Sequence, residues 1–314
     1  MSDVRLSTLM RIQGNNQALV DGTVAPQGFA LDLADVPQLT DGFRRMVRDL
    51  EFDVSEMPFA TYLCAREHDV PLTALPIFLV RGFHHGAIVH NVHSEVEVPR
   101  DLEGREVGVN RGYTVTTGVW ARGILEEEYG VDLRRVRWLR SGGEHVAGYA
   151  PPRNVGDIPE GKSLPQMLTN GELPAAVNVS VDRPDVKPLI PDHERASLEA
   201  LRRDGLYPIN HLIVVSDELL DEYAGLATAL FEAFAEAKAP YVRRLRHGEI
   251  ADLTDADRAY AQVIDILGDP LPYGVEPNRA MIETLIRHAT SQGIVATSVE
   301  PEEIFAEETR DLLA

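Results

Sequence analysis

The sequence predicts an α/β protein of two lobes, and two observations carry that prediction. Short apolar runs alternate along the chain with amphipathic stretches, the pattern of strands followed by helices. The chain has 314 residues, and at about 150 residues per domain this length gives two domains or one large divided domain. We therefore expect two small α/β units with a central cleft between them, followed by a helical C-terminal tail.

The first hundred residues predict short strands separated by helices. Asp41 can cap a helix in which Phe43, Met46, Val47 and Leu50 recur at helical spacing. Pro58 suits the first turn of the next helix, which runs to about Arg66. Strands are expected at 51–55, 74–79 and 87–92, and a proline- and charge-rich segment at 98–103.

The middle of the chain continues the alternation. Thr114 can open a long helix to Tyr129 that Gly130 ends, and Ser163 can cap a short helix to Asn170. The stretch 142–161 is rich in Gly and Pro and is expected to be loop, and 183–191 is proline-rich. Strands are expected at 106–109, 136–139, 174–179 and 208–215, with a helix at 194–204.

The last third of the chain is mostly helical. Apolar residues at three- and four-residue spacing predict helices at 219–246, 256–267 and 277–292, with a short one at 301–305. The chain is expected to cross between lobes near 98–101 and 207–211. This division places residues 1–100 and 211–314 in lobe I and residues 101–210 in lobe II.

Charge and composition exclude several function classes. Thirty Lys and Arg against 50 Asp and Glu give a formal charge of −20, which repels nucleic acid and anionic membranes. Any acidic substrate therefore requires a local cluster of positive charge. Cys64 is the one cysteine, so no intrachain disulfide forms. No apolar run of about 18 residues and no signal peptide is seen, so we expect a cytoplasmic protein without a membrane span.

Common cofactor and nucleophile motifs are absent from the sequence. It contains no GxxxxGK[ST], GxGxxG, HExxH or GxSxG pattern. His90 and His93 are expected on opposite faces of a strand, and with His68 they form no convincing metal set. We therefore predict neither a metal nor a cofactor.

The segment RGFHHGA between two expected strands is the first candidate site. Arg81 can pair with a carboxylate through its forked guanidinium, and His84 or His85 can donate a hydrogen bond or a proton. Adjacent residues of an extended chain point to opposite faces, so at most one histidine faces any given site. The alternative is a solvated turn.

The segment NRGYTVTTG is the second candidate site, because a glycine turn leads there into a helix. Backbone N–H groups at a helix start bind anions, and Tyr113, Thr114, Thr116 and Thr117 add hydroxyl donors. The alternative is simple N-capping by Thr114. These residues are candidates for holding a substrate carboxylate.

Five more residues are candidates because of their places beside expected strands. Glu56 lies between a strand and a helix, where it either caps the helix or acts as an acid. Asn210 and His211 open an apolar strand, and the alternative for His211 is a core histidine satisfied by backbone. Glu144, with His145 in the segment SGGEH, either transfers protons or lies in a surface turn.

Eight stretches in fixed order resemble the 4,5-dihydroxyphthalate decarboxylase family, from near Phe29 to the C-terminus. They are FDVSEMPFATYL, LPIFLVRGFHH, DLEGREVGV, TTGVWARGILEEEYGV, SLPQMLTNGEL, LYPINHLIVV, DPLPYGVEPNRAMIETLIRHATSQGI and PEEIFAEET. His85 matches the family histidine, although the family's Arg-His-Ser run is here His84-His85-Gly86. The resemblance implies a type II periplasmic-binding-protein-like fold.

The resemblance also implies a function, which is non-oxidative decarboxylation of a hydroxylated aromatic acid. The expected reaction converts 4,5-dihydroxyphthalate to protocatechuate without a cofactor. Arg81 and the helix start at 113–117 would hold carboxylate, His85 or Glu56 would deliver the proton, and His211 would handle the ring hydroxyl.

Other functions of the same fold stay open at this point. One alternative is a solute-binding protein for an aromatic or other small carboxylate, and another is an enzyme acting on a chorismate-derived acid. The expected partner is a small aromatic carboxylate. The amphipathic C-terminal helices fit either a homo-oligomer surface or a core.

Overall fold

The computed structural model describes residues 3–314, which form two compact α/β units. The first unit comprises Met1–Gly82, Ile209–Glu283 and Val299–Ala314, and the second comprises Phe83–Pro208 and Thr284–Ser298. The chain returns to the first unit at 208–209, within the range 207–211 expected for a crossing. The other crossing lies at 82–83 rather than near 98–101, because the following strand pairs within the second sheet. Residues 284–298 were also not expected in the second unit.

The first unit is built on a five-stranded sheet in the order β2-β1-β3-β11-β4. Strands β1, β2 and β3 are parallel, and β11 runs antiparallel to both β3 and β4. Strand β11, which lies between β3 and β4, has an apolar run, and its residues Leu212 to Val215 are fully buried. The strands are β1 Val4–Leu9, β2 Phe29–Leu33, β3 Val54–Pro58, β4 Leu72–Arg81 and β11 Ile209–Ser216.

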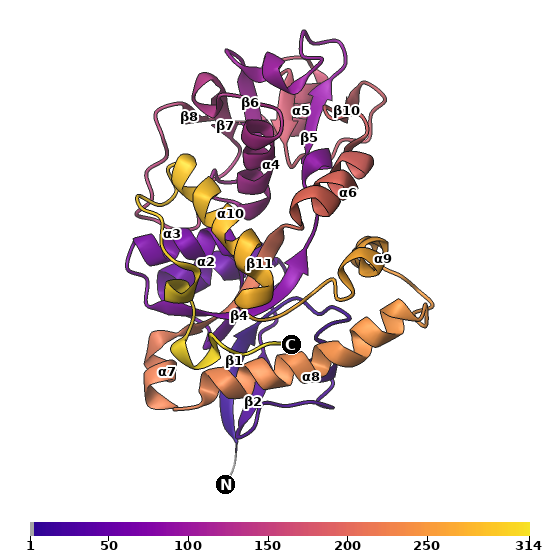
Figure 1. Cartoon of the computed structure of the whole chain (residues 1–314). Coiled ribbons are helices and arrows are strands. Elements are labelled where there is room, and N and C mark those ends of the chain that lie inside the picture. Colours follow the sequence, from indigo (N-terminus) through magenta and orange to yellow (C-terminus); the bar gives the residue numbers. More distant parts are fainter. Residues whose placement is uncertain (1–2) are drawn as a thin grey trace. The chain divides into compact units, whose positions relative to one another are not determined.

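Helices pack against this sheet at several points (Figure 1). Helix α3 contacts β3 and β11, and the long helix α8 contacts β4 and α9. The expected single helix at 219–246 is two, because Gly225 takes a left-handed conformation with φ of 84° between α7 and α8. The helices are α1 Gln17–Val20, α2 Leu39–Asp49, α3 Phe59–Glu67, α7 Asp217–Glu222, α8 Leu226–Arg246 and α9 Asp255–Leu267.

The second unit is built on a six-stranded sheet in the order β10-β5-β9-β6-β7-β8. Strand β5 runs antiparallel to both of its neighbours, β10 and β9, whereas the pairings that join β9, β6, β7 and β8 are parallel. Two three-residue strands, β8 and β10, lie in segments expected to be loop or proline-rich. The strands are β5 Ile88–Asn91, β6 Glu106–Val109, β7 Arg137–Arg140, β8 Val155–Asp157, β9 Ala175–Val177 and β10 Val186–Pro188.

Helices α4 (Thr116–Glu127), α5 (Leu164–Thr169) and α6 (His193–Asp204) belong to the second unit, and α10 (Arg279–Ser291) extends into it. Gly130 ends the α4 region as expected, with φ of 65° and its N–H bonded to the carbonyl of Glu126. Two expected caps are wrong. Helix α2 begins at Leu39, so Asp41 lies in its first turn. Helix α4 begins at Thr116 after Val115, so Thr114 precedes the cap.

No helix within residues 3–314 is long and apolar enough to cross a membrane.

Candidate active site

One edge of the first sheet gathers four of the predicted site residues. Strands β3 and β4 end at this edge, and β11, antiparallel to both, begins there. Arg81 is the last residue of β4 and pairs with Ile209, and His211 pairs with Pro58 of β3. Asn210 lies between Ile209 and His211 and is half-buried. The topology therefore places Glu56, Arg81, Asn210 and His211 close together.

Glu56 and His211 form a hydrogen-bonded pair at this edge. The distance from His211 Nδ1 to Glu56 Oε1 is 2.5 Å, and Glu56 Oε2 accepts the backbone N–H of Arg11 at 2.7 Å. The Glu56 side chain is fully buried, whereas the His211 side chain is 16% exposed. Phe43 packs edge-on against the imidazole, with 5.4 Å between ring centroids. Both the carboxylate and the ring are thus held in one orientation.

This pairing determines which nitrogen of His211 can take part in chemistry. With Nδ1–H donating to the Glu56 carboxylate, Nε2 is left to accept or donate a proton, as in other carboxylate-oriented histidines. Within residues 3–314, Glu56 is the one polar group bonded to the ring. Glu56 therefore does not cap helix α3, and its arrangement with His211 is that of a general acid–base pair.

Arg81 is held by a neutral neighbour that sequence analysis missed. Its Nη1 donates to Asn278 Oδ1 at 2.8 Å, and the Asn278 amide donates to the carbonyls of Pro272 and Gly274 at 2.9 and 2.8 Å. Because Asn278 is neutral, this contact positions the guanidinium without cancelling its charge. Arg81 is 7% exposed, so the charge lies in a largely desolvated position where a carboxylate is bound strongly.

Tyr260 of α9 is a second residue that sequence analysis missed. Its hydroxyl accepts the backbone N–H of Arg81 at 3.4 Å and lies 3.5 Å from the carbonyl of Leu79. Burial raises its pKa to about 12, Arg81 acts to lower that pKa, and Glu56 acts to raise it. The phenol therefore stays protonated and lies within electrostatic reach of both groups. No local signal separated it from the core residues of the predicted helix at 256–267.

In the second unit, the expected anion site at the start of α4 is already filled by Glu144. Its Oε1 accepts the N–H of Tyr113 at 2.7 Å and Arg140 Nη1 at 2.8 Å. Its Oε2 accepts the N–H and the hydroxyl of Thr114 at 3.0 and 2.8 Å. Glu144 thus acts here as an internal anion. It neither lies in a surface turn nor leaves those two N–H groups for a substrate carboxylate.

The remaining residues of this helix start are differently placed. Thr116 is 2% exposed and Thr117 is half-buried, and both lie in the first turn of α4. A Cβ at Gly112 would lie 2.5 Å from Glu144 Oε2, so the turn requires glycine for the carboxylate to approach. This close approach explains the glycine that the sequence places before Tyr113.

His85 is held in a buried network of the second unit. It is fully buried, its Nε2 lies 3.0 Å from Glu128 Oε1, and its Nδ1 lies 3.1 Å from Ser197 Oγ. His85 opens a 3₁₀ turn, His85–Ala87, so the two histidines do not alternate as on an extended strand. His84 is 5% exposed. His85 belongs to a different unit from Glu56 and His211, and both its nitrogens have partners.

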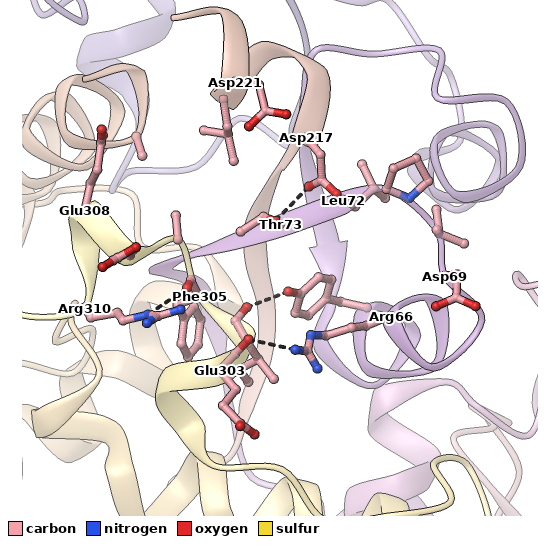
Figure 2. A pocket seen from close by; sticks show the side chains of 18 residues that line it. Arg66, Asp69, Leu72, Thr73, Asp217, Asp221, Glu303, Phe305, Glu308 and Arg310 are labelled. Atoms are coloured by element: carbon pink, nitrogen blue, oxygen red, sulfur yellow. Dashed lines mark hydrogen bonds between the residues drawn. The ribbon is translucent and has the colours of Figure 1, made fainter. Parts of the chain in front are cut away.

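Another pocket of the first unit lies at the opposite edge of its sheet (Figure 2). It has a volume of about 820 Å³ and lies where β4 begins, beside Thr73, whose hydroxyl donates to Asp217 at 2.7 Å. Arg66 and Arg310 are its two basic residues. Its acidic residues are Asp69, Asp217, Asp221, Glu303, Glu307 and Glu308. Because acids outnumber bases, this pocket repels the anionic substrate that the family resemblance implies.

Side chains of the types that bind metals do not converge in the described part of the chain. Within residues 3–314, no three His, Cys, Asp or Glu side chains are arranged to hold a metal ion. That the protein needs no metal stays a prediction.

Comparisons with curated proteins decide the family. The chain is 28% identical over 330 aligned positions to 4,5-dihydroxyphthalate decarboxylase of Comamonas testosteroni, covering 97% of both chains. It is 30% identical over 187 positions to the Pseudomonas putida enzyme of the same name, covering 56% of this chain and 71% of that enzyme. The chain belongs to the 4,5-dihydroxyphthalate decarboxylase family. No protein-family model matches it.

Solved structures confirm the fold predicted for this member of the 4,5-dihydroxyphthalate decarboxylase family. The alkanesulfonate-binding protein SsuA of Xanthomonas axonopodis pv. citri has a TM-score of 0.51 at 11% identity, covering 98% of each chain. The desulfurization enzyme DSZB has a TM-score of 0.52 at 12% identity, covering 96% of each chain.

The description of a third similar structure identifies the fold. A Candida albicans protein described as having the generic periplasmic binding protein fold has a TM-score of 0.50 at 9% identity, covering 95% of this chain and 92% of its own. The chain therefore has a two-lobed, two-sheet periplasmic-binding-protein-like fold. At these identities the structural likeness shows the fold alone.

Proposed function

We propose that the protein is a decarboxylase of a hydroxylated aromatic acid, with 4,5-dihydroxyphthalate as the first substrate to test. The observation that carries the proposal is the Glu56–His211 pair at the same sheet edge as Arg81. Family membership supports the reaction class, because the curated relatives are carboxy-lyases. The identity of 28% to the relative that covers nearly the whole chain leaves the substrate as part of this proposal.

The proposed reaction replaces a carboxylate on the ring with a proton. Protonation of the ring carbon that bears the carboxylate interrupts aromaticity, and a hydroxyl para to that carbon releases electrons to stabilise the intermediate. The bond to the carboxylate then breaks, its electron pair restores the aromatic ring, and CO₂ leaves. The net change consumes one proton, so the enzyme needs a positioned proton donor and a charge that holds the acid.

His211 is the proposed proton donor, and Glu56 is its positioning residue. Nε2 of His211 is the ring nitrogen not used by Glu56, so a protonated imidazole delivers its proton from that atom. The Glu56 carboxylate stabilises the positive ring before transfer and keeps its orientation afterwards. Water then returns a proton to Nε2. This assignment replaces the direct proton transfer from Glu56 or His85 that was expected, because neither of those side chains is exposed.

Arg81 is the proposed binding group for a substrate carboxylate. Its guanidinium donates through Nη1 to Asn278, and this contact helps to orient the fork before the substrate arrives. A preoriented guanidinium binds a carboxylate with little further loss of side-chain entropy. It also supplies the local positive charge that a chain with a formal charge of −20 requires.

The test is incubation of the purified protein with 4,5-dihydroxyphthalate, followed by chromatography for protocatechuate and measurement of CO₂. We expect equal amounts of both products, with and without a chelator. Loss of product only with the chelator would overturn the metal-independent mechanism. No product, together with a rise in melting temperature when the ligand is added, would overturn the enzyme proposal in favour of a binding protein.

A further inference from the structure

A small pocket in the first unit adjoins the Glu56–His211 pair. It has a volume of about 200 Å³ and is lined by the loop that follows β1, by Tyr241 of α8 and by the start of α9. Arg11 belongs to the loop and donates its N–H to Glu56, and Tyr260 of α9 also lines the pocket. Arg11 therefore connects the pocket to Glu56, and Tyr260 connects it to the backbone of Arg81.

The loop over this pocket is held in place by close packing. A Cβ added at Gly14 would lie 2.2 Å from a ring carbon of Tyr241, so the loop contacts that ring as only glycine allows. The Tyr241 hydroxyl donates to Asp257 Oδ1, and Asp257 Oδ2 accepts the N–H and the hydroxyl of Thr254. The pocket walls are thus built before any ligand binds.

Two buried polar atoms of the lining residues have no hydrogen-bond partner within residues 3–314. They are Nε2 of Gln13, a donor, and Oδ1 of Asn15, an acceptor. Asn15 is 1% exposed, and its Nδ2 donates to the carbonyl of Leu79 at 2.9 Å, which sets the orientation of the amide. Buried polar atoms without partners are uncommon, and both of these belong to residues that line the pocket.

The chemistry of the pocket selects uncharged oxygen groups. Gln13, Asn15 and the protonated phenol of Tyr260 are neutral, and the two charged lining residues, Arg11 and Asp257, are of opposite sign, so the lining carries no net charge. A hydroxyl both donates and accepts, so two neighbouring hydroxyls match one unpartnered donor and one unpartnered acceptor. Ile12 and Ala256 add apolar wall for a ring.

We propose that this pocket recognises the vicinal hydroxyl groups of an aromatic ligand. Gln13 Nε2 donates to one hydroxyl oxygen, and Asn15 Oδ1 accepts from the neighbouring hydroxyl. Gln13 and Asn15 are thereby specificity-determining residues, while Arg81 binds the acid. This inference rests on the proposed function, since it assigns part of that same substrate.

The test compares two ligands that the proposed reaction does not consume. One is its product protocatechuate, which is 3,4-dihydroxybenzoate, and the other is benzoate. Titration calorimetry measures both dissociation constants for the wild type, for Gln13→Met and for Gln17→Met. Gln17 is exposed and does not line the pocket, so it is the matched control. We expect the wild type and the control to prefer the dihydroxylated ligand roughly tenfold, and Gln13→Met to lose most of that preference.

Each other outcome is decisive. An unchanged preference in Gln13→Met, an equal loss for both ligands, or no preference in the wild type would overturn the pocket assignment. Wild-type protein that shows the preference but no turnover of 4,5-dihydroxyphthalate would overturn the proposed function and leave the hydroxyl pocket standing. Turnover of 4,5-dihydroxyphthalate without a role for Gln13 would overturn the pocket assignment and leave the proposed function standing.

Discussion

The imidazole of His211 lies 2.5 Å from the carboxylate of Glu56, although 155 positions separate the two residues in the sequence. The antiparallel pairing of β3 with β11 makes this contact, since both side chains lie on one face two positions apart in register. The contact places a buried carboxylate behind a partly exposed base. That relationship leads directly to the first prediction.

Replacing Glu56 with Gln should lower kcat by roughly 100-fold, because the neutral amide no longer stabilises the protonated ring of His211. Binding of 3,4-dihydroxybenzoate should change little, since Glu56 is buried behind the histidine. Steady-state kinetics and calorimetry measure the two effects. The exposed Glu160→Gln is the control, and activity of Glu56→Gln within about twofold of this control would contradict the assignment.

Replacing Arg81 with Ala should lower kcat/KM by roughly 100- to 1,000-fold, because a substrate carboxylate loses its charged partner. Arg81→Lys keeps the charge but not the fork, so it should recover only part of the loss. Kinetics on both variants give the comparison, with circular dichroism to check folding. Unchanged turnover in Arg81→Ala would remove Arg81 from the site.

The parts of the fold that could be predicted from the sequence are the elements whose own residues define them. The strand at 106–109 and the end of the α4 region at Gly130 match the prediction, because a short apolar run and a glycine suffice to define them. The N-terminal strands β1 and β2 were not predicted. Their sequences, VRLSTL and FALDL, are interrupted by Arg5, Ser7 and Asp32, so neither shows an uninterrupted apolar run.

The site was predictable as a set of residues but not as a set of contacts. Glu56 and His211 were both candidates, yet only the sheet register shows that they bond to each other. Glu144 and the turn at Tyr113 were also both candidates, and the structure shows that one satisfies the other. Tyr260 carried no signal, since a buried aromatic residue on a helix looks like core in any sequence.

Replacing Glu144 with Ala should destabilise the protein by about 2–4 kcal/mol, because the buried N–H groups of Tyr113 and Thr114 would lose their acceptor. Urea unfolding measures the free energy of unfolding. The matched control is Glu106→Ala, because Glu106 pairs with Arg137 at an exposed position. This substitution should lower the free energy of unfolding by less than about 1 kcal/mol. Equal stability of the two variants would contradict the internal-anion role.

Gly123 of α4 and His288 of α10 should show strong energetic coupling. A Cβ at Gly123 would lie 2.4–2.5 Å from three ring atoms of His288, so Gly123→Ala should cost about 1–3 kcal/mol. In a His288→Ala background the ring is gone, and the same substitution should cost nothing or stabilise the helix. A double-mutant cycle by urea unfolding measures this coupling, and additive effects would contradict it.

His288 should also make stability depend on pH. Burial lowers its pKa from the ordinary histidine value of 6.5 to about 4, with Arg287 and Arg122 adding to the lowering and Glu127 opposing it. The unfolded chain therefore binds the proton more readily than the folded one. Above pH 6.5 the imidazole is neutral in both states and no penalty arises, whereas stability falls as the pH drops from 6.5 toward 4.

The measurement is the free energy of unfolding of the wild type and of His288→Asn at about pH 7.5 and about pH 4.5, on either side of the ordinary histidine pKa. Titrating groups that do not contact His288 contribute equally in the two proteins, so their contributions cancel in the difference. The wild type should lose about 2 kcal/mol more than His288→Asn between these pH values. A parallel fall in both proteins would show that His288 takes up its proton in the folded state without penalty.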